Sequence, residues 1–82
     1  MVVRKLSTLG AMGTTGDPDR LFAMNGKILL MEMKRPGGKC TMRQLISHEE
    51  WTRAGIQVVV VDDVKAGRDV LTAMYGAPTA TR

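Results

Sequence analysis

The amino-acid sequence predicts an α/β fold in which a mixed sheet contains a β-hairpin and is flanked by helices. The Asn25-Gly26 pair between two apolar runs is typical of a tight hairpin turn, because both central residues of a type I′ turn need a positive φ. Residues 56–61 form a nearly continuous apolar run, which is typical of a strand that crossover helices bury on both faces. Residues 41–55 and 62–76 combine helical periodicity with capping residues.

The length and composition favour one small domain. With 82 residues, of which 44% are hydrophobic, the chain can form a core but bury only roughly 60–65% of its unfolded surface, so dimerisation is an expected source of stability. The single cysteine, Cys40, excludes an intramolecular disulfide and suits a reducing cytoplasm. We expect no membrane span and no signal peptide, and the net charge of +4 favours an anionic partner.

The first half of the sequence predicts a strand, a loop and the hairpin. Residues 2–9 alternate imperfectly and predict a first strand. Residues 10–16 are rich in glycine but lack the Gly-Lys-Ser/Thr ending and the following helix of a phosphate loop, so we expect a flexible loop beside the functional site. Hairpin strands are predicted at residues 20–24 and 27–31. The proline and two glycines of residues 35–39 predict an irregular connection.

A helix is predicted to begin after Thr41, as the N-cap, and to end at Gly55 in the C′ position. Thr41 and Gln44 have the spacing of a capping box. One face of this helix carries Gln44, Ser47, His48 and Trp51, and nearly the opposite face carries Met42, Leu45, Ile46 and Glu49. Because apolar side chains occur on both faces, we expect one face to pack on the sheet and the other to meet a partner or a second layer.

The chain is predicted to end with a buried strand and a second helix. After the strand, Asp62 or Asp63 is the expected N-cap of a helix that ends at Gly76. Residues 1–76 are therefore predicted to form the folded domain, and residues 77–82 a disordered tail.

The hairpin places charged residues at the same depth in the sheet. A turn centred between Asn25 and Gly26 pairs Asp19 with Glu32. Glu32 and Lys34 share one face of the strand because side chains alternate. Two carboxylates in cross-strand contact repel one another, so stability does not explain their pairing. A divalent cation bound between them would remove the repulsion.

These residues resemble a nuclease signature. Pro18-Asp19 and the later Glu32-Met33-Lys34 are similar to the PD-(D/E)XK motif. With the Arg-Pro-Gly-Gly loop and Gln44 downstream, the sequence resembles the virus-type replication-repair nuclease (VRR-NUC) branch of that superfamily over residues 3–71. The resemblance implies a restriction-endonuclease-like core that hydrolyses DNA phosphodiester bonds, located in the cytoplasm of a bacterial or phage-infected cell.

The resemblance also implies a metal site and a catalytic set. Asp19 and Glu32, together with the main-chain carbonyl of Met33, would bind Mg²⁺ or Mn²⁺. Lys34 would orient or activate the attacking water and stabilise the negative charge that develops on the phosphate. Gln44 would contact the same active site.

The predicted function is a metal-dependent, structure-selective DNA endonuclease, and the implied assembly is a homodimer that resolves four-way (Holliday) junctions. Basic residues around the site are expected to contact the DNA backbone without sequence preference. They are Lys5, Arg20, Lys27, Arg35, Lys39 and Arg43. Relatives usually carry an upstream helix with a further acid, whereas no acid precedes Asp17 here. The alternatives are a non-catalytic DNA-binding module and a small binder of acidic ligands.

The same residues also have purely structural interpretations. The acids and the lysine of the hairpin would form an exposed cross-strand ion pair, which contributes little to stability. Asp17 is interpreted as a turn former rather than a metal ligand. His48 has no second histidine or cysteine at ligand spacing, so we expect packing or a hydrogen bond near the sheet and no zinc site. Gln44 can act as a helix cap and as an active-site contact at once.

Overall fold

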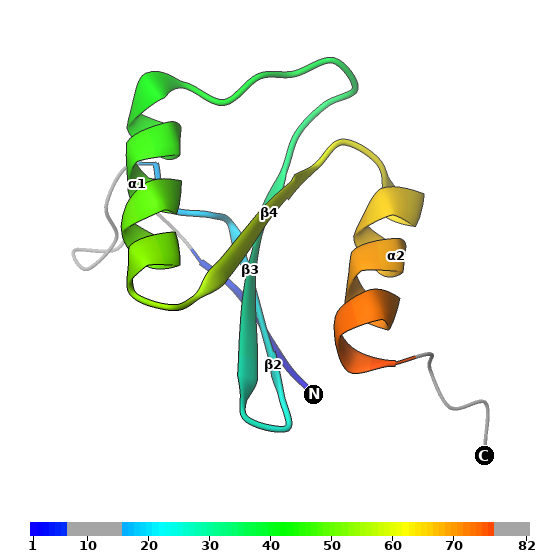
Figure 1. Cartoon of the computed structure of the whole chain (residues 1–82). Coiled ribbons are helices and arrows are strands. Elements are labelled where there is room, and N and C mark those ends of the chain that lie inside the picture. Colours follow the sequence, from blue (N-terminus) through cyan, green and yellow to red (C-terminus); the bar gives the residue numbers. More distant parts are fainter. Residues whose placement is uncertain (7–15, 77–82) are drawn as a thin grey trace.

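Among the residues that the structure describes, four strands form a single mixed sheet with one helix on each face (Figure 1). The computed structural model describes residues 1–6 and 16–76. In chain order the elements are β1 (Val2–Lys5), β2 (Arg20–Met24), β3 (Lys27–Met33), α1 (Met42–Arg53), β4 (Gln57–Val61) and α2 (Val64–Tyr75). The strand order is β1-β2-β3-β4, with antiparallel pairing up to β3 and parallel pairing between β3 and β4. The predicted α/β fold with a mixed sheet is confirmed.

The hairpin of β2 and β3 has the turn and the register that the sequence predicts. Asn25 and Gly26 adopt φ angles of 54° and 76°, as a type I′ turn requires. Arg20 pairs with Met31. Continuing this register by one residue brings the two predicted carboxylates opposite each other at the end of the hairpin.

Both helices begin and end where the sequence predicts. The Thr41 side chain accepts a hydrogen bond from Gln44 N, and the Gln44 side chain accepts one from Thr41 N, which completes the capping box of α1. Asp63 caps α2 by accepting a 2.6 Å hydrogen bond from a main-chain N–H of the first turn. Gly55 and Gly76 follow the two helices, each with a φ of 92°.

The hydrophobic core lies between the sheet and α2. Leu29, Met31 and Val61 are buried there. The partly buried apolar side chains packed against them are Phe22, Met33, Val59, Ala66, Val70, Leu71, Met74 and Tyr75. Gly67 is the buried residue of α2, and a Cβ at this position would make an ordinary van der Waals contact with the sulfur of Met31, at 3.5 Å.

Strand β4 is less buried than its apolar sequence predicts. It forms one edge of the sheet described here, with β3 as its hydrogen-bonded neighbour. Val59 and Val61 face the core under α2, whereas Val60 is 46% exposed. The expectation that this strand is buried on both faces is therefore wrong, because a single short helix on the second face leaves the edge of the sheet partly uncovered.

Three predictions fall partly or wholly outside the described residues. Strand β1 ends at Lys5, and Leu6 N still donates to Asp19 O at 2.9 Å, but the rest of the predicted first strand lies beyond residue 6. The glycine-rich loop before residue 16 and the tail at residues 77–82 lie outside as well. In the part of the chain that is described, no helix has the length and apolar character needed to cross a membrane.

Candidate active site

Glu32 is the buried acid at the centre of the candidate site. It is the next-to-last residue of β3, and its side chain lies on the face of the sheet that α1 covers. Only 6% of the residue is exposed. Burial raises the pKa of Glu32, the nearby charge of Asp19 raises it further, and the ammonium of Lys34 lowers it. The described protein groups therefore compensate the charge of this carboxylate only in part.

Lys34 and Gln44 converge on Glu32 from the end of β3 and from α1. Lys34 Nζ lies 3.8 Å from Glu32 Oε2 and donates a 2.7 Å hydrogen bond to Gln44 Oε1. Gln44 Nε2 donates a longer hydrogen bond, 3.5 Å, to the same Glu32 oxygen. Lys34 N also donates to Val61 O at 2.8 Å, which ties its main chain to β4. The prediction that Glu32 and Lys34 share one face is confirmed.

Gln44 combines the two roles that its position in the sequence allows. Its Oε1 accepts a 2.9 Å hydrogen bond from Thr41 N, which caps α1, as well as the hydrogen bond from Lys34 Nζ. The capping box therefore also orients the side-chain amide of Gln44. Its oxygen faces Lys34 and its nitrogen faces the carboxylate of Glu32. The start of the helix and the geometry of the site depend on one side chain.

Asp19 lies directly before β2 and approaches the same end of β3. Its Oδ1 accepts a 3.2 Å hydrogen bond from Met33 N, and its main-chain oxygen accepts one from Leu6 N. Its charge is close enough to raise the pKa of Glu32. The hairpin thus brings Asp19 and Glu32 to the same place, while the side chain of Met33 packs into the core on the other face.

Asp17 makes contacts that sequence reasoning did not identify. Its Oδ1 accepts hydrogen bonds from Ser47 Oγ at 2.6 Å and from Trp51 Nε1 at 3.3 Å. Both donors lie on the face of α1 that also carries Gln44 and His48, and their shared position on one face is the signal in the sequence that points to this contact. These hydrogen bonds attach the segment before β2 to α1, only two residues from Asp19.

The same segment lies against the first turns of α1. Gly16 has a φ of +101°, and a Cβ at this position would lie 2.9 Å from both side-chain and main-chain atoms of Arg43. Pro18 is fully buried. Residue 16 therefore has to be glycine if Asp17 is to reach Ser47.

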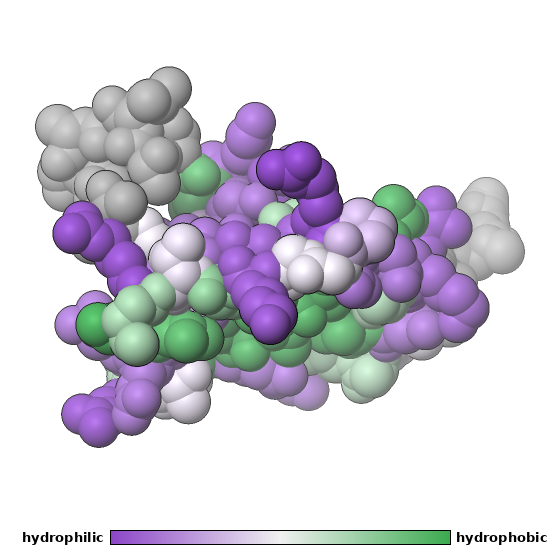
Figure 2. Space-filling view, turned by 90° about the horizontal axis from the view of Figure 1, so that it is seen from above, coloured by the Kyte–Doolittle hydropathy of each residue, from purple (hydrophilic) through white to green (hydrophobic). Residues whose placement is uncertain are grey.

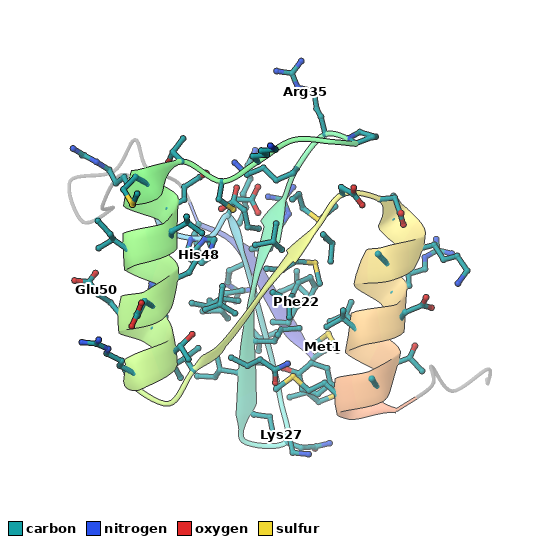
Figure 3. All side chains as sticks on the ribbon, turned by 45° about the horizontal axis from the view of Figure 1, so that its top comes forward. Met1, Phe22, Lys27, Arg35, His48 and Glu50 are labelled. Atoms are coloured by element: carbon teal, nitrogen blue, oxygen red, sulfur yellow. The ribbon has the colours of Figure 1, made fainter. Side chains whose placement is uncertain are left out.

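His48 approaches Glu32 from α1. His48 Nε2 lies 3.8 Å from Glu32 Oε1, and both atoms are buried without a hydrogen-bond partner among the described residues. Figure 3 shows His48 directed toward the sheet and Glu50 directed away from it. Burial and the charge of Lys34 lower the pKa of His48, and Asp17 opposes this effect. The expected packing near the sheet is confirmed, but the approach to Glu32 was not predicted.

The candidate DNA-contacting residues do not all lie near this site. Arg35 lies at the end of the molecule that carries the site, whereas Lys27 lies at the opposite end, beside the hairpin turn (Figure 3). Lys27 is therefore not part of the basic cluster that the sequence suggested. Arg20 is half-buried and donates to Asp19 O at 3.3 Å. The remaining basic candidates are exposed, namely Lys5, Lys39 and Arg43.

The outer face of α1 is apolar and exposed. Met42 is 71% exposed, Leu45 51% and Ile46 55%. The helix therefore presents apolar groups on the side away from the sheet, as the sequence predicts, and no described residue covers them.

Viewed from above, hydrophilic residues occupy the centre of the molecular surface and a hydrophobic band runs beside them (Figure 2).

Few side chains at the site could hold a metal ion. Among the described residues, no three His, Cys, Asp or Glu side chains are grouped so as to bind one. Two carboxylates, of Asp19 and Glu32, and the main-chain oxygen of Met33 remain as donors of the kind that Mg²⁺ prefers. Glu32 Oε1 is buried without a described partner, which suits an oxygen that receives a cation. This set fits an ion that takes most of its ligands from water or a substrate phosphate.

The fold and the site define a small α/β domain with an acid, a lysine and a glutamine grouped at the carboxyl end of two parallel strands. Its sequence is similar to that of a phage protein called "Putative nuclease p44", from Acyrthosiphon pisum secondary endosymbiont phage 1, with 49% identity over 51 residues. The match covers 61% of this chain and 55% of that protein, so it spans about half the length of the relative. No protein-family model matches the chain.

Proposed function

We propose that this chain is a metal-dependent DNA endonuclease of the PD-(D/E)XK superfamily, similar to its VRR-NUC branch. The observation that carries the proposal is the contact of Lys34 and Gln44 with the buried carboxylate of Glu32, beside Asp19. The nuclease name of the phage relative supports it. The reaction would be hydrolysis of a DNA phosphodiester bond.

The metal ion would be Mg²⁺ or Mn²⁺, held by Asp19, Glu32 and the main-chain oxygen of Met33. When bound, such an ion supplies an activated water and neutralises charge on the phosphate. The hydrogen bond from Met33 N to Asp19 Oδ1 fixes one carboxylate relative to the main chain that would supply the third ligand. This contact supports a ligand set in which Asp19 and the main chain of Met33 would act together.

Lys34 would act on the attacking water and on the charge that develops at the phosphate. An ammonium group has three N–H donors, and one of them is used in the 2.7 Å hydrogen bond to Gln44 Oε1. This hydrogen bond holds Nζ beside Glu32 and leaves two donors for the water and a phosphate oxygen. Gln44 would therefore act as a positioning residue, since it contacts both Lys34 and Glu32.

Exposed basic residues near the site would bind the DNA backbone. The two carboxylates of the site repel phosphate, so affinity has to come from cations around them. Arg35 lies next to Lys34 in the chain, and it is exposed at this end of the molecule (Figure 3). Lys5, Lys39 and Arg43 are exposed as well, and Arg20 lies beside Asp19.

A two-fold homodimer that cuts branched DNA is the assembly that we propose. The exposed apolar residues on the outer face of α1 motivate it, because a two-fold interface uses the same patch from both subunits. Such a dimer would carry two copies of the site at a fixed separation. This geometry suits paired cuts on opposite strands of a four-way junction.

A non-catalytic DNA-binding module is the second candidate function. One observation favours it: as the described side chains stand, no three His, Cys, Asp or Glu residues are grouped closely enough to bind a metal ion. Such a module would bind the same DNA through the same basic residues. It would not cleave DNA in any divalent ion.

The test is a cleavage assay on labelled four-way junctions and on linear duplexes of the same sequence. We expect cleavage with Mg²⁺ or Mn²⁺, binding without turnover in Ca²⁺, and loss of cleavage in excess EDTA. Binding without cleavage in every ion would favour the second candidate. Undiminished cleavage in EDTA would contradict a metal-dependent mechanism, and equal cleavage of both substrates would contradict junction selectivity.

A further inference from the structure

Two buried polar atoms face one another in the candidate site without a hydrogen-bond partner among the described residues. They are Glu32 Oε1 and His48 Nε2, 3.8 Å apart. Glu32 is 6% exposed and His48 9%, so bulk water does not solvate them freely. A buried donor or acceptor that stays unpaired costs roughly 1–3 kcal/mol, so a ligand that satisfies both atoms would be stabilising.

The two oxygens of Glu32 have different surroundings. Oε2 faces Lys34 Nζ at 3.8 Å and Gln44 Nε2 at 3.5 Å, which are both hydrogen-bond donors. Oε1 faces only the imidazole nitrogen of His48 among the contacts described. One oxygen is thus held by the protein, and the other is directed at the imidazole of His48 on α1.

The separation of the two atoms is too long for a direct hydrogen bond, which would need about 2.9 Å. Mn²⁺ and Mg²⁺ are octahedral, and bonds of about 2.1 Å to two neighbouring ligands would place those atoms about 3.0 Å apart. The measured 3.8 Å therefore requires a closure of about 0.8 Å, which a change in the side-chain torsions of His48 would supply. A cation binds both atoms when neither carries a proton, so it satisfies two acceptors that cannot pair with each other.

We propose that His48 Nε2 is a ligand of the ion that Glu32 binds, and that this nitrogen makes the site prefer Mn²⁺ to Mg²⁺. This inference rests on the proposed function, because it assumes an ion at Glu32. Mg²⁺ and Ca²⁺ are hard ions that bind through oxygen. An imidazole nitrogen favours first-row transition ions, of which Mn²⁺ is the one that also accepts carboxylate and water ligands readily.

The rival explanation is a purely structural pair in which the imidazole N–H donates to the carboxylate after a larger movement. Both explanations place His48 against Glu32, and both predict that changing His48 affects stability. They differ in whether a histidine nitrogen is bonded to the ion. The decisive measurement therefore has to detect that bond directly and not through activity.

The chain offers a clean experiment because His48 is its only histidine. Mn²⁺ is added to the full chain, purified without a polyhistidine tag, and pulsed electron paramagnetic resonance is used to detect coupling between the ion and a nitrogen nucleus. Isothermal titration gives the affinities for Mn²⁺ and Mg²⁺. The same measurements are made on His48→Gln, on Glu32→Gln, and on Glu50→Gln as a matched control on the outward face of α1.

We expect nitrogen coupling in the wild type and in Glu50→Gln, and none in His48→Gln. His48→Gln should weaken Mn²⁺ binding by about tenfold or more and Mg²⁺ binding by much less. If Mn²⁺ binds in a Glu32-dependent manner but without nitrogen coupling, the inference is wrong and the proposed metal site stands. If no Mn²⁺ binds in a Glu32-dependent manner, both the inference and the proposed metal site fail. A wild-type protein that binds Mn²⁺ without nitrogen coupling contradicts the inference, even if the His48 variant does not fold.

Discussion

The hydroxyl of Ser47 donates a 2.6 Å hydrogen bond to the carboxylate of Asp17, from the middle of α1 to the segment that precedes β2. Trp51 Nε1 donates to the same carboxylate oxygen, one turn further along the helix. Asp19 is two residues away and lies beside Glu32. The contact therefore sets how the helix that carries Gln44 and His48 is placed relative to the acids of the hairpin.

Removing this hydroxyl should destabilise the protein. Ser47→Ala leaves the Asp17 carboxylate with one fewer donor, and hydrogen bonds to charged groups contribute roughly 1.5–3 kcal/mol to the free energy of unfolding. Urea unfolding followed by fluorescence of Trp51, the single tryptophan, measures the loss. Thr52→Ala is the control, because Thr52 Oγ1 bonds only a carbonyl of its own helix, that of His48. Equal losses of unfolding free energy in the two variants would show that the hydrogen bond to Asp17 stabilises the protein no more than a hydrogen bond within the helix does.

The phenol of Tyr75 predicts a stability change at high pH. Its single proton is shared between two carbonyl oxygens, Lys27 O at 3.0 Å and Phe22 O at 3.2 Å, and burial raises the pKa of Tyr75 above the ordinary value of about 10. The native state then keeps the proton at a pH where the unfolded chain has lost it, so the free energy of unfolding falls as the pH rises above about 10. Tyr75→Phe should lose this fall relative to the wild type.

Absorbance titration gives a direct check, because the chain contains one tyrosine. The folded protein should form tyrosinate at a higher pH than the urea-unfolded protein. Coincident titration curves would contradict the predicted shift. Tyr75→Phe should also lower stability at neutral pH by about 1 kcal/mol, the usual effect of losing a hydrogen bond.

The position of the basic residues predicts which of them bind DNA. Arg35→Ala should weaken binding to all DNA sequences alike and reduce the slope of log affinity against log salt by about 0.9 for each phosphate that the arginine neutralises. Lys27→Ala removes the same charge at the opposite end of the molecule, a strand length of roughly 20 Å away, and should leave the slope unchanged. Fluorescence anisotropy at several salt concentrations gives both slopes. Equal effects of the two variants would rule out a backbone contact specific to Arg35.

The exposed face of α1 predicts a dimer that a single charge can disrupt. Leu45→Glu places a carboxylate in the proposed two-fold interface, where it would face the same carboxylate of the other subunit and repel it. We therefore expect monomers. They should lose paired incision of junctions before they lose metal binding. Val64→Glu removes a comparably exposed apolar side chain from α2 and should leave the assembly unchanged. Sedimentation velocity distinguishes the two forms. A wild type that is monomeric at micromolar concentration would contradict the proposal.

Local signals in the sequence predicted the elements that they control. The Asn25-Gly26 turn set the hairpin register, and the Thr41 and Asp63 caps set where the helices begin. The same register was sufficient to bring Asp19 to Glu32, because residues paired across a short turn have no freedom to slip. Periodicity also identified the outward apolar face of α1.

Contacts between distant segments were harder to predict. Nothing local indicates that Asp17 would meet a helix thirty residues later, since an aspartate before proline is equally suited to a turn. The edge position of β4 depends on which strands join the sheet, and an apolar run alone does not reveal it. His48 faces Glu32 only because α1 packs over the end of β3, which is a consequence of tertiary structure.

The proposed mechanism requires the Glu32 carboxylate for DNA cleavage, and a comparison of Glu32→Ala with Glu50→Ala measures this requirement. Both changes remove a glutamate, but Glu50 lies on the outward face of α1 (Figure 3). Initial rates of junction cleavage in Mn²⁺ are measured alongside junction binding in Ca²⁺. We expect Glu32→Ala to bind the junction but to cleave it at least about a hundredfold more slowly, while Glu50→Ala cleaves like the wild type. Cleavage by Glu32→Ala at a rate close to that of the wild type would show that this carboxylate does not take part in the reaction.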